Sequence, residues 1–152
     1  MGATRFYHLT QSPLERALQS LLERSLQAGW HVVVRGRDAA RMDWLDRALW
    51  QGPDDGFLPH GLAGGPMDAR QPVLLTTGTD RPNGAACMMS VDGAGVDASE
   101  CAALERVCIL FDGNDPAALT RARQQWKDLT SQGVAAEYWS EESGRWQMKS
   151  RG

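Results

Sequence analysis

The sequence predicts a single-domain α/β fold in which a largely parallel central sheet is flanked by helices. Short apolar runs rich in β-branched residues alternate along the chain with longer segments whose leucines recur at helical spacing. This alternation is typical of parallel strands joined by right-handed helical crossovers. The length of 152 residues suits one domain, and no repeat, linker or shift in composition divides the chain. We therefore assign residues 1–152 to one domain.

The first third of the chain predicts strand, helix, strand and helix. Arg5–Leu9 is short and aromatic-rich, which favours a strand. Ser12 is placed to cap a helix whose first residue is Pro13, and leucines at helical spacing follow. Val32–Val34 is a β-branched run typical of a buried strand. Asp38 can cap the second helix.

The rest of the chain predicts a long loop, three strands, a long helix and two closing strands. Glycines and prolines break every period from Gln51 to Gln71, and loops of that length in compact domains are often functional. Asp115 and Pro116 begin the last long helix. The predicted strands lie at 72–77, 86–91, 106–111, 134–139 and 145–148.

Composition limits the class of function. The net charge is −3, with 16 Lys and Arg against 19 Asp and Glu, whereas proteins that mainly grip a phosphate backbone usually carry a basic excess. No run approaches the length of a membrane span, and the first residues do not read as a signal peptide. We therefore expect a cytoplasmic protein without membrane contact.

The three cysteines, Cys87, Cys101 and Cys108, are odd in number and widely spaced. A disulfide framework needs pairs and a zinc site needs close pairs. The spacing therefore favours reduced, partly buried thiols, and we expect no metal and no cofactor.

The glycine-rich segment Gly61–Gly65 is the first candidate for chemistry. It matches neither a dinucleotide fingerprint nor a phosphate-binding loop, and it leads into a proline rather than a helix. His8, His31 and His60 lie in separate segments, and no catalytic motif surrounds them. Because a catalytic site can assemble from distant residues, a small nucleotide-binding or hydrolytic α/β enzyme using His60 and Gly61–Gly65 stays open as an alternative.

Large apolar side chains mark the start of the long loop. Trp50 ends a helix, and Phe57, Leu58 and Pro59 follow in the loop. Such side chains either fold back under their own loop or form a docking patch for a partner protein, and the pattern alone favours neither.

The last long helix carries Arg123, Trp126 and Lys127 at positions i, i+3 and i+4, so they lie on one side of it. Two cations beside an indole can bind a peptide that carries carboxylates and an apolar or aromatic side chain. A solvated cation pair beside a core tryptophan is the competing interpretation.

Together these segments resemble the chi subunit family of the bacterial DNA polymerase III holoenzyme, a clamp-loader accessory subunit. The resemblance spans most of the chain but not 78–105, and its most specific part follows a helix that ends in Ala48-Leu49-Trp50. The matching segments are Phe6-Tyr7-x-Leu9, Leu45-Asp46-x-Ala48-Leu49-Trp50, Phe57-Leu58-Pro59-His60-x-Leu62-Ala63-Gly64, Pro72-Val73 and Ala122-Arg123-x-x-Trp126-Lys127, with Gly133 and Trp146.

The resemblance implies a Rossmann-like topology without a nucleotide site and a non-catalytic role in DNA replication. It implies that the chain links the clamp-loader complex, through its psi subunit, to the acidic C-terminal tail of single-stranded DNA-binding protein (SSB), and so contacts DNA only indirectly. Carried over by motif, Arg123, Trp126 and Lys127 form the tail site. Trp50 with Phe57, Leu58 and Pro59 falls in the region assigned to psi.

Two departures from the family concern the tail site. Trp126 stands where the family has a tyrosine-like residue, and Thr130 stands where a basic residue can occur. Arg121 is the nearby cation that could replace the missing charge. A third interpretation, direct binding of nucleic acid with tryptophans as stacking platforms, runs against the acidic balance of the chain.

Overall fold

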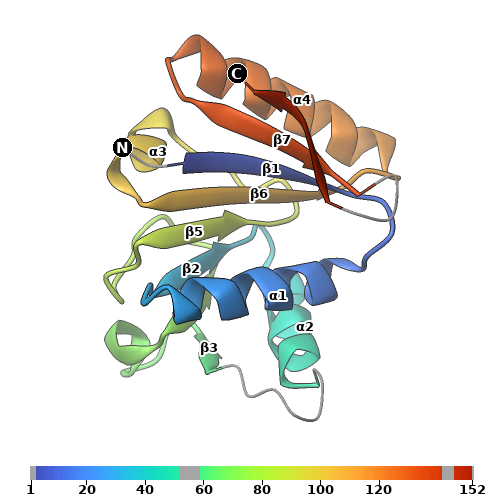
Figure 1. Ribbon diagram of the computed structural model, residues 1–152. Coiled ribbons are helices and arrows are strands. Elements are labelled where there is room, and N and C mark those ends of the chain that lie inside the picture. The colour runs from blue at the N-terminus through green and yellow to red at the C-terminus, as the bar shows by residue number, and fades with distance from the viewer. Residues whose placement is uncertain (1–2, 52–58, 142–145, 152) are drawn as a thin grey trace.

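The computed structural model describes residues 3–51, 59–141 and 146–151 and confirms the single-sheet α/β class (Figure 1). Within these residues one eight-stranded sheet has the order β3-β4-β2-β5-β6-β1-β7-β8. All neighbours are parallel except β7 and β8, which form an antiparallel pair at one edge. The strands are β1 Ala3–Leu9, β2 Val32–Arg35, β3 His60–Leu62, β4 Val73–Thr76, β5 Cys87–Ser90, β6 Arg106–Asp112, β7 Ala136–Ser140 and β8 Gln147–Arg151.

Helices cover both faces of the sheet (Figure 1). One face packs against α1 and α2 through residues such as Tyr7 and Val34, and the other packs against α3 and α4 through Phe6 and Ile109. Because successive strand residues point to opposite faces, neighbours such as Phe6 and Tyr7 enter different cores. The helices are α1 Leu14–Gln27, α2 Ala39–Trp50, α3 Ala98–Ala103 and α4 Pro116–Ser131, with a short 3₁₀ turn η1 at Asp68–Arg70.

The strand order creates a crevice between β1 and β6. These neighbouring strands continue into helices on opposite faces of the sheet, since β1 leads to α1 and β6 leads to α4. Such a topological switch point is where open α/β sheets bind ligands. The crevice is therefore a candidate position for a ligand site in this fold.

Two local predictions need correction, and one short helix was not predicted. Ser12 is not the N-cap of α1: Pro13 takes that position without a side-chain cap bond, and Ser12 instead contacts Glu141. The segment 51–71 is not a continuous loop, because it contains β3 and η1. The unmatched segment 78–105 contains the short helix α3, whose six residues are too few to show helical periodicity.

Within the described residues, no helix combines the length and apolar character needed to cross a membrane.

Candidate partner-binding sites

Helix α4 presents the cation pair that the sequence predicts. Its N-cap Asp115 accepts a hydrogen bond from the Ala117 N–H at 3.1 Å, and Pro116 is the first helical residue. Arg123 and Lys127 are exposed, and neither forms an ion pair with any residue that the structure describes. Both cations are therefore available to an external carboxylate.

Trp126 lies between these cations but is held by the sheet. Its ring packs edge-on against Phe6 at 5.3 Å and against Tyr138 at 5.9 Å between centroids. The side chain is half-buried and belongs to the core on the α4 side. Trp126 therefore anchors the helix to the core, as the competing interpretation expects, and still contributes a partly exposed surface.

Neither Thr130 nor Arg121 supplies a third cation beside Arg123 and Lys127. The Thr130 hydroxyl donates to the Trp126 carbonyl oxygen at 2.8 Å, so it serves the helix backbone. Arg121 lies against the turn at Gly93, in the crevice between β1 and β6. The Arg121 guanidinium is thus committed to a different surface from Arg123 and Lys127.

A second exposed surface forms where α2 meets β3. Trp50 is 51% exposed and its ring lies 4.3 Å from that of His60 between centroids, with an interplanar angle of 35°. His60 is buried, and its Nε2 lies 3.0 Å from the backbone oxygen and 3.3 Å from Oδ1 of Asp46. Pro59, directly before His60, is half-buried. The buried His60 ring therefore supports one side of the exposed Trp50 ring. Phe57 and Leu58 lie outside the described residues.

The glycine-rich segment does not form a phosphate cradle. Gly61 lies in the edge strand β3, and the N–H groups of Gly64 and Gly65 donate to the Asp68 carboxylate at 2.9 and 3.1 Å. The donors that a phosphate would need are thus taken by an acidic side chain of the same loop. His60 is also occupied, because it is stacked and bonded within the α2–β3 contact.

The crevice at the topological switch point is similarly closed to phosphate. It has a volume of about 460 Å³ beside the start of α1 and α4. The β1–α1 loop, whose N–H groups would face a phosphate there, instead surrounds the buried Glu141 carboxylate. Glu141 Oε1 accepts from the backbone N–H groups of Thr10, Gln11 and Ser12 at 3.1, 2.9 and 2.7 Å, and Oε2 accepts from the Ser12 hydroxyl at 2.8 Å.

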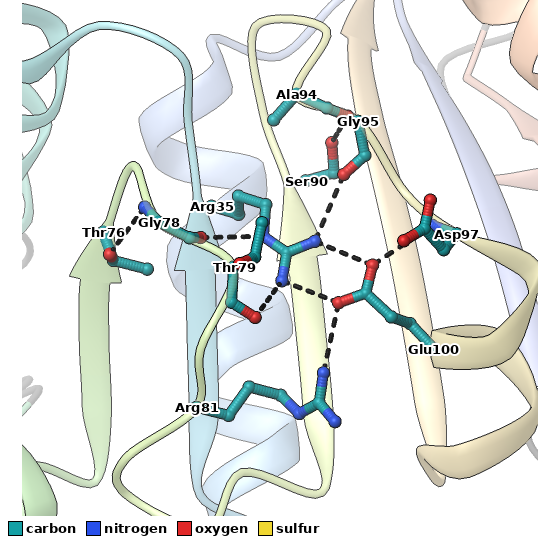
Figure 2. Close-up of polar contacts among 10 residues, drawn as sticks. All are labelled: Arg35, Thr76, Gly78, Thr79, Arg81, Ser90, Ala94, Gly95, Asp97 and Glu100. Carbon is teal, nitrogen blue, oxygen red and sulfur yellow. Dashed lines mark hydrogen bonds and ion pairs between the residues drawn. The ribbon is translucent and has the colours of Figure 1, made fainter.

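A polar cluster missed by the sequence analysis centres on Arg35 at the end of β2 (Figure 2). All five guanidinium donors are used: two meet the Glu100 carboxylate at 2.9 and 2.7 Å, and three meet the backbone oxygens of Gly78, Thr79 and Gly95 at 3.1 to 3.2 Å. Arg35 is 3% exposed. It therefore fastens the loops after β4 and β5 to α3 and has no donor left for a ligand.

The same cluster changes the ionisation of Glu100. Burial alone would raise the pKa of this carboxyl, but bonds from Arg35 and the Asp97 N–H, with the nearby charge of Arg81, bring the pKa below its ordinary value of 4.5. The sequence signal for this cluster was Arg35 itself, which directly follows the apolar run Val32–Val34. An arginine at the end of a buried strand requires an acidic or polar partner.

The three cysteines are free and buried, in agreement with the free thiols that their spacing predicts. Burial raises the pKa of Cys101. No group of His, Cys, Asp and Glu side chains able to hold a metal ion occurs among residues 3–51, 59–141 and 146–151.

The fold and these surfaces define a class: a mostly parallel α/β domain whose loops at the switch point and in the glycine-rich segment hold the domain's own carboxylates. It exposes Arg123, Lys127 and Trp50 outside those loops. The family model described as "DNA polymerase III chi subunit, HolC" matches residues 1–137, and the chain belongs to this family. It is also similar to a protein of Rickettsia prowazekii (strain Madrid E) named "Probable DNA polymerase III subunit chi". The two are 26% identical over 85 residues, which is 56% of this chain and only about half, 52%, of that relative.

Proposed function

We propose that this chain is a non-catalytic adaptor of DNA replication in the cytoplasm. It links the clamp-loader complex, through the psi subunit, to the acidic C-terminal tail of SSB. Membership of the chi family supports a role as a polymerase III accessory subunit. The observation that carries the finer proposal is that Arg123 and Lys127 are exposed beside the anchored indole of Trp126 and form no ion pair with any described residue.

The chemistry of α4 suits an acidic tail. A guanidinium binds a carboxylate through two hydrogen bonds, and an ammonium adds an adaptable charge. The net charge of −3 does not prevent this, because charges within a Debye length of roughly 8–10 Å dominate a local contact. A site with two cations should bind one tail weakly, and several tails on one SSB assembly raise the effective affinity.

The test is a titration with a labelled peptide that copies the acidic C-terminus of SSB, at low and moderate salt. Arg123→Ala and Lys127→Ala should each weaken binding and reduce its salt dependence. Arg121→Ala is the matched control, because Arg121 lies on the same helix but against Gly93, and it should bind like the parent protein. Failure of the folded parent protein to bind at high micromolar peptide would reject the tail site.

Trp50 is the residue on which we base the psi surface. It is the most exposed large apolar side chain of α2, and its ring stacks on His60, which follows Phe57, Leu58 and Pro59 in the sequence. Large aromatic side chains are the usual anchors of protein interfaces. Trp50→Ala should abolish co-purification with psi while the tail affinity stays unchanged, and Trp44→Ala on the same helix serves as control. Equal recovery of psi by all three proteins would assign the psi contact to another surface.

The alternative enzyme finds no support at its own candidate residues. The N–H groups of Gly64 and Gly65 are bonded to Asp68, and His60 is held by Asp46 and Trp50.

A further inference from the structure

A groove beside α1 gathers aromatic and cationic side chains that neither proposed partner surface uses. It has a volume of about 190 Å³ and lies between α1 and the last two strands. Tyr7, Trp139 and Trp146 supply its rings, Arg5 and Arg24 its charges, and Leu21 part of its apolar wall. These side chains share the α1 side of the sheet, whereas Trp126 belongs to the core on the α4 side.

The rings of the groove are fixed and partly open. Trp146 stands perpendicular to Tyr7, with an interplanar angle of 89° and 5.2 Å between centroids. It is nevertheless 36% exposed, and Trp139 beside it is half-buried. An exposed tryptophan held by a rigid neighbour loses little conformational entropy when a planar ligand stacks on it.

The charges of the groove are positive. The Arg5 guanidinium lies 5.6 Å from the centre of the Trp139 ring, and its Nε is 3.3 Å from a carboxylate oxygen of Glu137. Arg24 is exposed and pairs with no acidic side chain in the part of the chain that the structure describes. No acidic residue lines the groove among the described residues, but the Glu137 carboxylate behind it also accepts a hydrogen bond from Trp139 Nε1–H at 3.1 Å, so Arg24 is the cation of the groove without an acidic partner there. A ligand that combines flat rings with negative charge therefore fits it.

We propose that this groove binds single-stranded nucleic acid, with one base stacked on Trp146 and Trp139 and the flanking phosphates near Arg5 and Arg24. Stacking platforms beside a cationic wall are how proteins hold single strands without reading sequence, and arginine adds cation–π contacts. This goes beyond the adaptor function and rests on different residues. It departs from the expectation that the protein contacts DNA only indirectly, and it places the direct contact at one local cationic groove of an acidic chain.

The test measures binding of a labelled oligothymidine to the full chain at low salt by fluorescence anisotropy. Trp146→Ala should weaken binding roughly 5- to 150-fold, the range for losing one base–aromatic stack. Arg24→Gln should also weaken binding, and the slope of log affinity against log salt should fall in magnitude by about 0.7 if one phosphate contact is lost. Circular dichroism checks that both variants remain folded.

Trp44→Ala and Arg47→Gln are the matched controls, because both side chains are exposed on α2, outside the groove. Both should bind the oligonucleotide like the parent protein. Absence of saturable binding by the parent protein overturns the proposal. So does equal binding by the groove variants and the parent. None of these outcomes touches the tail site, whose variants lie on α4.

Discussion

At the scale of single residues, three carboxylates of the chain fill positions that a ligand would otherwise need. Asp68 holds the glycine-rich loop, Glu141 holds the β1–α1 loop, and Glu100 holds Arg35. Each supplies an internal acceptor in place of water or an anion, for exposed N–H groups at Asp68 and for partly buried donors at Glu141 and Glu100. The consequence is that, among the described residues, the donors of these loops are bonded within the protein itself.

The Arg35–Glu100 pair should be a large single contribution to stability. Removing one partner of a buried ion pair leaves the other charge uncompensated, which typically costs about 3–5 kcal/mol. The two side chains are 4% and 12% exposed. Arg35→Met should therefore lower the free energy of unfolding by about 3–5 kcal/mol, measured by urea denaturation.

The control for that variant is Arg47→Ala, which breaks the Arg47–Asp43 pair. Its side chains are 72% and 46% exposed, so the loss should be at most about 0.5 kcal/mol. Similar losses from both variants would mean that the Arg35 cluster does not organise the loops as described.

Glu141 should make stability depend on acid pH. Burial alone would raise its pKa, but the bonds from Ser12, Gln11 and Thr10 bring the pKa of Glu141 below its ordinary value of 4.5. A carboxyl whose pKa is lower in the folded state stabilises the protein above its unfolded pKa, and that stability is lost as pH falls through the folded pKa. Glu141→Gln should thus cost about 1–3 kcal/mol at neutral pH.

The measurement is urea unfolding of both proteins at neutral pH and at steps below pH 4.5. The difference in unfolding free energy between parent and Glu141→Gln should shrink as the pH falls through that lower range. Glu100, whose pKa is also lowered, is present in both proteins and cancels. A difference that stays constant with pH would show that the Gln amide cannot replace the carboxylate for steric reasons rather than for charge.

At the scale of elements, strands and long helices could be predicted because each carries its own signal. The β-branched run Val32–Val34 indicates a strand and the leucine spacing of α1 indicates a helix, both from neighbouring residues alone. The contacts of Ser12 could not be predicted, because Glu141 lies 129 positions away. Strand β3 could not be predicted either, because its three residues form a strand through pairing with β4 and not through their own propensity.

Two helix caps allow a direct comparison. Asp115 at the start of α4 accepts a bond from the Ala117 N–H, whereas Asp38 at the start of α2 makes no side-chain cap bond. Asp115→Ala should therefore cost about 1 kcal/mol. Asp38→Ala should cost only a few tenths of a kcal/mol, from the helix dipole alone. Chemical denaturation of the two variants measures both, and the reverse order would contradict the assigned caps.

At the scale of the whole molecule, the family and the cation pair of α4 could be predicted, since both rest on short local motifs. The Trp139–Trp146 groove could not, because the fold alone brings Tyr7, Leu21 and Trp139 together. Nor could the role of Trp126 be settled from spacing, because a helical tryptophan beside cations is equally consistent with core and with surface.

The two proposed partner surfaces lie on opposite sides of the sheet. Helix α2 packs on one face and α4 on the other (Figure 1). An adaptor must hold both partners at once, and no described contact joins Trp50 to Arg123 or Lys127. Two sites influence each other only if both change the conformation of a shared element. Because no such element joins the psi surface on α2 to the tail site on α4 among the described contacts, the coupling free energy between the two sites should be near zero.

This separation predicts a ternary complex without cooperativity. The affinity for the acidic SSB peptide should be the same, within about twofold, for the chain alone and for its complex with psi. Isothermal titration of the peptide into both samples measures the ratio, with Lys127→Ala as the control that lowers both affinities together. Displacement of psi by the peptide would mean that the surfaces overlap, and the chain could then not bridge the clamp loader to SSB.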